Sequence, residues 1–345
     1  MTRLDELAGR PDWSQHGGWL RRLTGQLVAP SPVLLRRVAL AGLLASALII
    51  LTGAAVRLSQ SGLGCPDWPA CTASTPGPGD AAGSSLLHEW IEFGNRLVTI
   101  AIFIISVLVS VVAWRFTDAS GRRRSDLIWL ALAQPASIVL QAALGGVVVL
   151  TDLDPIWVSV HFLASIALIA ATVALYERCQ EGSEPARWLV RRELRLLSRA
   201  MIAVLALMIA AGTVVTGTGP LAGARDVARY NLHLAAVTQL HADIGWLLGG
   251  LMTGLALCLW LSPAPRRAAR LGWLLLGLIG AQGAVGYAQY FSGLPAGLVW
   301  VHVCGAVLIW ITALRLLFAL RDRGPLTGRI PARASAPAHA QVQDG

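Results

Sequence analysis

Three histidines lie inside strongly apolar segments of this sequence, where an ionisable side chain is costly and therefore informative. His161, His241 and His302 each come a turn or two after the expected outer end of their segment, so we expect them at a common depth. A single histidine of this kind can simply bond a neighbouring helix, whereas three at one depth favour metal ligation. Imidazoles from facing helices suit haem iron, because zinc or two-iron sites need further Cys or carboxylate ligands. We expect His241 and His302 to hold one haem between them.

A second polar group lies in the apolar segment that begins near residue 87. His88, Glu92, Asn95 and Arg96 have the i, i+4, i+7 and i+8 spacing that places residues on one face of a helix. Glu92, buried in such a segment, is a candidate proton acceptor. The alternative is a structural ion pair in which Glu92 and Arg96 neutralise each other.

A short loop follows the first apolar segment and has the sequence Cys65-Pro-Asp-Trp-Pro-Ala-Cys71. We expect this loop outside the cytoplasm, where a disulfide can persist. Closing so short a loop stabilises a protein by about 2–3 kcal/mol in the chain-entropy description. The pair is therefore either a structural staple or a redox-active dithiol. Cys179, Cys258 and Cys304 are isolated, and we expect them to be inert.

The apolar segments that carry these residues dominate the composition. Of 345 residues, 55% are hydrophobic and 14% are charged, and the mean hydropathy is +0.61, whereas soluble domains carry about 25% charged residues. A soluble enzyme is therefore excluded. Eight runs can each cross a membrane as a helix of about 20 residues; they cover approximately 38–58, 87–114, 127–150, 157–176, 200–216, 234–261, 271–290 and 298–320. The expected fold class is an all-α integral membrane protein with eight transmembrane helices.

The net charge of +9 would suit a nucleic-acid partner, but the positions of the charges indicate another role. All but four of the 28 basic residues lie in the two tails and in every second connection between the runs. Because short cytoplasmic loops are enriched in positive charge, we expect a multi-pass protein of the cell membrane with both termini in the cytoplasm, lipid contacts and no nucleic-acid partner. The exceptions are Arg57, Arg96, Arg225 and Arg229. Arg57 and Arg96 are candidate partners of haem propionates or of Glu92.

The two halves of the sequence repeat each other. The recurring pairs are Gln141 and Gln282, Gly145 and Gly286, and His161 and His302, each 141 residues apart. Gly53 and Gly212 form a weaker pair, and we separately align Asn95 with His241. Each half contributes four spans, so we expect two parallel four-helix bundles. Gln141 and Gln282 are further candidate haem contacts.

The expected domains follow from this repeat. They are a cytoplasmic tail (1–35), an N-terminal bundle (36–177) with a disulfide loop (59–86), a cytoplasmic linker (178–197), a C-terminal bundle (198–320) and a disordered cytoplasmic tail (321–345).

The run Gly53-x3-Arg57-Leu-Ser-x-Ser-Gly-Leu-x-Cys65-Pro-Asp-Trp-Pro-x-Cys71, followed by Ile91-Glu92-Phe93-x-Asn95-Arg96 and the three later histidines, resembles the haem A synthase family. The resemblance extends from about residue 36 to residue 320. It implies haem b on His241 and His302 in the C-terminal bundle, and substrate haem O in the N-terminal bundle with His161 as a ligand of its iron. It also implies that a methyl group of haem O is oxidised in successive steps to a formyl group, with Glu92 as the essential acidic residue, to give haem A for terminal oxidase assembly. A haem O synthase and an electron donor are candidate partners, and the chain is a candidate homo-oligomer.

One position departs from the family pattern Glu-x-x-His-Arg, because Asn95 stands where the histidine is expected. Either the substrate iron is bound through His161 alone, or His88 binds its other side. Two other classes of function compete with the resemblance. A di-haem electron carrier predicts two equivalent bis-histidine sites, against which Asn95 argues. A transporter would use Glu92, Arg96 and the repeat interface as a midplane site, and unbroken helices argue against it.

Overall fold

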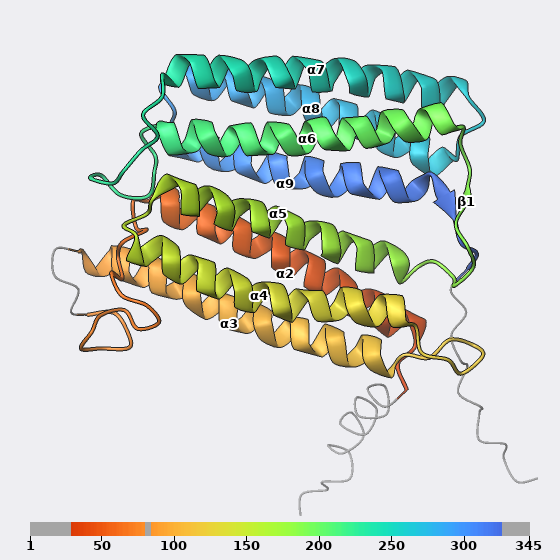
Figure 1. Cartoon of the computed structure of the whole chain (residues 1–345), viewed down its shortest axis with the longest axis horizontal. Coiled ribbons are helices and arrows are strands. Elements are labelled where there is room, and N and C mark those ends of the chain that lie inside the picture. The colour runs from red at the N-terminus through yellow and green to blue at the C-terminus, as the bar shows by residue number, and fades with distance from the viewer. Residues whose placement is uncertain (1–28, 80–83, 326–345) are drawn as a thin grey trace, which may run out of the picture.

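The computed structural model describes residues 29–79 and 84–325, and within them eight long helices run side by side (Figure 1). Every one is long and apolar enough to cross a membrane, which confirms the predicted fold class. Most of both predicted tails, 1–28 and 326–345, lies outside the described residues, as do residues 80–83 of the disulfide loop. The helices are α2 (Pro32–Leu58), α3 (Leu86–Arg115), α4 (Ser125–Leu150), α5 (Pro155–Arg178), α6 (Arg192–Thr218), α7 (Leu234–Leu261), α8 (Arg266–Phe291) and α9 (Ala296–Ala319).

Three of the helices, α2, α3 and α5, begin at a side-chain cap, and several helix starts differ from the limits of the apolar runs. The side chains of Ser31 and Asp154 accept hydrogen bonds from backbone N–H groups in the first turns of α2 and α5, each with proline at the first helical position. Helices α6 and α8 begin earlier than their apolar runs, because their arginine-rich first turns are also helical. Helix α6 therefore begins inside the predicted linker 178–197. The two-residue strands β1 (Arg187–Trp188) and β2 (Arg321–Asp322) pair antiparallel and were not predicted, since a ladder this short has no periodicity.

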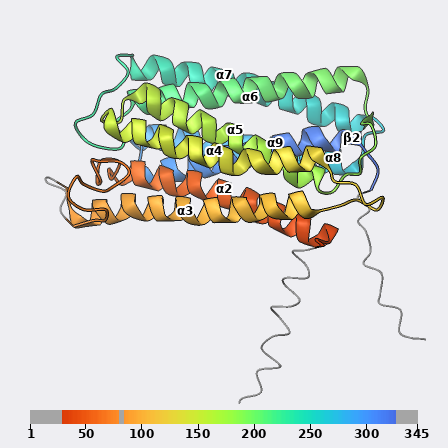
Figure 2. The same ribbon diagram turned by 60° about the horizontal axis from the view of Figure 1, so that its bottom comes forward.

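The helices form two groups of four, α2–α5 and α6–α9, as the repeat predicts (Figure 1). The groups meet through α2 and α5 on one side and α6 and α9 on the other. Two indole N–H groups of α9 donate across this interface to backbone carbonyls, from Trp300 to Leu51 and from Trp310 to Ile166, both at 3.0 Å. In the turned view the helices still run along one direction, and the loop that follows α2 stays at one end of them (Figure 2). We call this the disulfide end.

The tightly packed core fills the half of the molecule farther from the disulfide end. The largest fully buried side chains all lie in or next to that half of their helices; they include Leu35, Phe116, Leu127, Met201, Met252, Leu259, Leu275 and Leu316. At that far end Glu177 of α5, 2% exposed, accepts hydrogen bonds from Arg267 of α8 and Arg315 of α9. This buried carboxylate links the group α2–α5 to the group α6–α9. The predicted site residues lie at the other end of the helices, nearer the disulfide end.

Helix α4 contains Pro135 but continues through it. Proline cannot supply the N–H that would bond the carbonyl four residues earlier. The hydroxyl of Ser110 on α3 donates to that carbonyl, on Ala131, at 3.0 Å. The expectation of unbroken spans therefore holds, because a neighbouring helix satisfies the freed group.

Candidate functional site

The structure brings the rings of His241 of α7 and His302 of α9 opposite each other in the C-terminal bundle. Their ring centroids are 6.4 Å apart, with the planes tilted by 59°. Two imidazoles that bind one metal ion from opposite sides need about this separation between their centroids. Each metal–nitrogen bond is about 2 Å long, and the ring centroid lies farther from the metal than the bound nitrogen. The Nδ1 atoms of both rings are buried and lack hydrogen-bond partners among the described residues. The pair therefore fits a two-sided axial site for haem iron.

Each of the three span histidines packs against a glycine on a neighbouring helix. A Cβ atom built on Gly212 of α6 would lie 3.2 Å from His241 Cε1, and one on Gly286 of α8 would lie 3.3 Å from His302 Cε1. Gly145 of α4 has the same relation to His161, at 3.5 Å. The rings therefore pack closely against these glycines, most tightly at Gly212 and Gly286. The sequence shows that these glycines recur in the two halves, but it does not show which histidine each one contacts.

Asn95, which aligns with His241 in the other half of the sequence, has an amide side chain where the other three positions have histidine. Asn95 of α3 accepts a hydrogen bond from Thr52 Oγ1 of α2 at 2.8 Å. A Cβ on the neighbouring Gly53 would meet nothing within 4 Å, so the space that a ring would fill is open. His88 lies in the first turn of α3 and its backbone N–H is capped by Ser85. The N-terminal bundle thus offers His161 without a matching second histidine.

Gln141 and Gln282 hold the histidine-bearing helices in both bundles. Gln282 Nε2 donates directly to the backbone carbonyl of His302 at 2.8 Å. Gln141 Nε2 donates to the hydroxyl of Ser165 at 2.8 Å, and that hydroxyl donates to the carbonyl of His161 at 3.0 Å. Each glutamine therefore anchors the backbone carbonyl of the histidine in its own bundle, directly at His302 and through Ser165 at His161. The sequence did not suggest this role for the glutamines.

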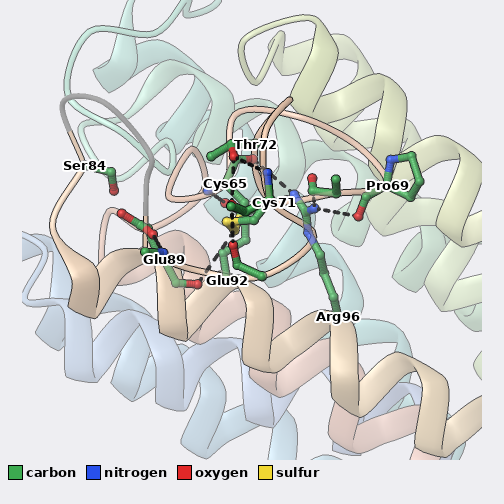
Figure 3. Close-up of a disulfide and its surroundings, with 12 residues drawn as sticks. Cys65, Pro69, Cys71, Thr72, Ser84, Glu89, Glu92 and Arg96 are labelled. Atoms are coloured by element: carbon green, nitrogen blue, oxygen red, sulfur yellow. Dashed lines mark hydrogen bonds and ion pairs between the residues drawn. A yellow bond between two sulfur atoms is a disulfide. The ribbon is translucent and has the colours of Figure 1, made fainter.

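Glu92 and Arg96 form an ion pair that also anchors the disulfide loop (Figure 3). Glu92 is only 6% exposed; its Oε1 lies 2.6 Å from an Arg96 nitrogen, and its Oε2 accepts the backbone N–H of Cys65 at 2.8 Å. The Arg96 guanidinium also donates to the carbonyls of Cys65, Pro69 and Ala70 at 2.9–3.2 Å. The ion pair, one of the two interpretations that the sequence leaves open, is present, and the loop backbone supplies the remaining partners.

The loop itself is closed and docked onto a second helix. Cys65 and Cys71 form the predicted disulfide, and both are fully buried. The indole of Trp68 lies against Gly146 of α4, where a Cβ would approach a ring carbon to 2.8 Å. Contacts from both α3 and α4 therefore hold the loop over the disulfide end of the N-terminal bundle.

Arg57 lies at the last turn of α2, near the loop that joins α6 to α7. A Cβ on Gly223 of that loop would lie 3.6 Å from Arg57 Cγ. Within residues 29–79 and 84–325, no hydrogen bond or ion pair is made by its guanidinium. Unlike the Arg96 guanidinium, the Arg57 guanidinium has N–H donors available to another acceptor.

The remaining cysteines are separate from this site. Cys179 is 2% exposed, and burial raises the pKa of its thiol to about 12, so it stays protonated and unreactive. Cys258 and Cys304 carry free thiols. Across the described residues, no three His, Cys, Asp or Glu side chains gather into a cluster that could hold a bare metal ion.

Arg96→Met should destabilise the protein, because it leaves the buried carboxylate of Glu92 without its cation. Breaking one partner of a buried pair costs about 3 kcal/mol, and three loop carbonyls lose a donor as well. Denaturant unfolding of the solubilised protein measures this loss. Arg225→Met, at an exposed arginine in another loop, is the control, and equal stability of the two variants would contradict the anchoring role.

Comparison with known proteins finds a matching family and several similar chains. The model of the family COX15-CtaA, described as cytochrome oxidase assembly protein, matches residues 36–314. A Shewanella oneidensis protein named heme A synthase is 25% identical over 327 residues, which cover 82% of this chain and 96% of that protein. A heme A synthase of Bacillus cereus is 30% identical over 123 residues, 36% of each chain. One of Lysinibacillus sphaericus is 34% identical over 110 residues, covering 32% of this chain and 33% of the relative.

Proposed function

This chain belongs to the COX15-CtaA family of cytochrome oxidase assembly proteins, and from that premise we propose how its residues divide the work of a haem A synthase. It is a multi-pass membrane oxidoreductase that converts a methyl group of haem O into the formyl group of haem A. The observation that carries the proposal is the asymmetry between the two bundles. One presents a facing histidine pair, and the other presents one histidine beneath a docked, disulfide-closed loop.

In the C-terminal bundle, His241 and His302 hold a resident haem b. The 6.4 Å ring separation and the glycines behind both rings support this assignment. When bound, a haem with two imidazole ligands supplies one-electron transfer. Gln282 bonds the backbone carbonyl of His302 and so holds the turn of α9 that carries the ring.

In the N-terminal bundle, His161 binds the iron of the substrate haem O on one side. Asn95 is a poor ligand for the opposite side, because its amide is neutral and its oxygen already accepts a bond from Thr52. An open side suits a site that must admit an oxidant. Arg57, whose guanidinium makes no hydrogen bond or ion pair among the described residues, is a further candidate partner for a haem propionate.

Glu92 handles protons released as the substrate methyl loses hydrogen in two successive oxidations. A carboxylate has about four lone-pair positions, so Glu92 can take one proton, on either Oε1 or Oε2, while it keeps its bonds to Arg96 and to the Cys65 N–H. The same bonds fix the carboxylate in place. The structural and chemical interpretations of Glu92 are therefore compatible.

The arginine distribution supports an orientation with both termini and the buried Glu177 cluster on the cytoplasmic side, and the disulfide end outside. A haem O synthase that delivers substrate and a membrane electron donor are the partners this arrangement requires.

The proposed role of Glu92 is tested in membranes of a host that makes haem O and has no haem A synthase of its own. The wild-type chain should accumulate haem A, and Glu92→Gln should lower the rate by about 100-fold, the size expected for loss of a general base. Glu89→Gln is the matched control, because Glu89 is an equally buried carboxylate one turn earlier that bonds only the loop. Haem A formation at the normal rate by Glu92→Gln, with unchanged haem B content, would remove Glu92 from the reaction.

A further inference from the structure

Helices α7 and α8 form the side of the C-terminal bundle that faces away from the other group of four helices (Figure 1). On this side Trp246 of α7 is 70% exposed and Tyr287 of α8 is 46% exposed. The indole Nε1 of Trp246 donates a hydrogen bond to the hydroxyl of Tyr287 at 3.1 Å. The Tyr287 ring stacks on that of Phe291, with 14° between the planes. Aromatic side chains therefore lie along the seam between the two helices, where a membrane protein contacts lipid.

Two polar side chains lie beside these rings. Gln239 and Asp243 are both exposed and one turn apart on α7, and Gln239 Nε2 donates to Asp243 Oδ1 at 2.7 Å. Asp243 comes three residues before Trp246, so these two are neighbours on one face of the helix. We call Gln239, Asp243, Trp246 and Tyr287 the α7–α8 surface.

The α7–α8 surface lies at the depth of the hydrocarbon layer. Helix α7 has 28 residues and is about 42 Å long, whereas the hydrocarbon layer is about 30 Å thick. Asp243 comes nine residues after the first residue of α7, about 13 Å along the helix, and Trp246 lies deeper still. In the part of the chain that the structure describes, Asp243 Oδ2 accepts no hydrogen bond and the hydroxyl proton of Tyr287 has no acceptor. Because unsatisfied polar groups are costly in lipid, these groups fit a ligand that bonds to them.

The N-terminal bundle is apolar at the equivalent positions. When Asn95 is aligned with His241, the three α7 residues of the surface correspond to the α3 residues Phe93, Leu97 and Ile100. In the 141-residue repeat, Tyr287 corresponds to Gly146. The fold therefore does not require polar and aromatic groups on this side of a bundle. They accompany the bundle that contains the facing histidine pair.

The α7–α8 surface is also close to that histidine pair. Tyr287 directly follows Gly286, where a Cβ would lie 3.3 Å from the ring of His302. Asp243 follows His241 by two residues, and two residues turn a helix by about 200°, so Asp243 lies on the opposite side of α7 from His241. The width of one helix, about 10 Å, therefore separates the surface from the site proposed for haem b.

We propose that the α7–α8 surface binds a hydroquinone dissolved in the membrane, which supplies electrons to the haem b held by His241 and His302. The inference rests on the proposed function, because it names the chemical class of the membrane electron donor. A hydroquinone has a flat aromatic ring, which suits the exposed rings of Trp246 and Tyr287. Its hydroxyl groups can donate to Asp243 Oδ2 and accept the O–H of Tyr287. Its apolar tail keeps it in the lipid layer, from which this surface is reached.

The bound hydroquinone loses two electrons and two protons and becomes the quinone. The electrons leave one at a time, and each reduces the iron between His241 and His302 from the ferric to the ferrous state. Each electron is passed on to the substrate site before the next one arrives, so the iron returns to the ferric state in between. Both protons are released to the water at the disulfide end, which is the nearer end of α7.

The rate at which a hydroquinone reduces the purified, haem-loaded protein tests this surface. Without oxygen, a hydroquinone with a decyl tail should produce the absorption bands of ferrous haem b. Asp243→Leu, which installs the α3 residue, should lower the rate constant about tenfold, the effect of losing a hydrogen bond to a charged group. Tyr287→Phe should lower it about fivefold, because a neutral hydrogen bond is lost. Ile100→Ala is the matched control, since it truncates an exposed side chain at the α3 position equivalent to Trp246, and it should leave the rate unchanged.

Dithionite distinguishes loss of this surface from loss of the haem. It is a small, water-soluble reductant that does not need the α7–α8 surface, so it should reduce the wild type and the variants at equal rates. Equal rates with the hydroquinone in the wild type, Asp243→Leu and Tyr287→Phe would overturn the proposal. A protein in which dithionite finds no haem to reduce would contradict the proposed function instead.

Photolabelling locates the binding site whether or not haem is present. An azido-substituted quinone with the same decyl tail should label peptides of α7 and α8 on illumination, and an excess of the unlabelled quinone should prevent the labelling. Asp243→Leu should lower the labelling about tenfold at low quinone concentration, while Ile100→Ala should not change it. Labelling that spreads evenly over the lipid-facing helices, or that the competitor does not prevent, would overturn the proposal even in a protein that carries haem b.

Discussion

Replacing His302 with alanine should strip the purified protein of most of its haem B. The ring of His302 faces that of His241, and loss of an axial ligand should weaken iron binding at least as much as loss of a supporting residue, which costs about 10–100-fold in metal affinity. The backbone carbonyl that Gln282 bonds is retained in the variant, so α9 should keep its position. The measurement is haem B extracted per mole of protein. Haem A formation should stop as well, because the proposed electron-transfer haem is gone.

The matched control is His233→Ala. His233 precedes the first turn of α7 and is exposed, so the variant removes an imidazole near the same end of the bundle without touching the facing pair. It should retain wild-type haem B. A His302→Ala protein with full haem B content would show that the facing histidines are packing residues.

Asn95→His should convert the substrate site from one-sided to two-sided ligation of haem iron. The new ring would lie beside Gly53, where the structure leaves open space, as His241 lies beside Gly212. A second imidazole on iron changes its spin state, because two strong axial ligands favour the low-spin form. With haem O bound, absorption and electron paramagnetic resonance spectra should therefore shift from mixed high- and low-spin signals to low-spin signals alone.

The His88→Ala variant distinguishes the two arrangements that the sequence left open. If His161 is the only ligand of the substrate iron, His88→Ala should leave the spectra unchanged. Loss of a low-spin signal in His88→Ala, together with no spectral change in Asn95→His, would instead assign the second side of the iron to His88.

The sequence predicted the parts of this molecule that depend on local pattern. Eight apolar runs gave eight helices, since a span is specified by its own composition. The spacing of Cys65 and Cys71 allowed only a short closed loop, and that disulfide is present. The common depth of His241 and His302 followed from counting residues along their helices, and the structure brings the two rings together.

Contacts between distant segments were beyond local pattern. The pairing of Glu92 with Arg96 was one of two open interpretations, but their bonds to the loop depend on how residues 65–71 fold back over α3. The glycine behind each histidine could not be assigned because it lies on another helix. Helix ends at α6 and α8 also differed, since hydropathy marks the membrane layer and not where a helix begins.

Identification of the pigment carried by the purified protein tests the central claim most directly. Haem extracted from protein made in a host that supplies haem O should separate, by chromatography and mass, into haem B together with haem O or haem A. One resident haem and one substrate or product haem would match the two unequal sites. Haem B alone would indicate an electron carrier and contradict the proposed substrate site, and a protein with no haem would contradict both sites.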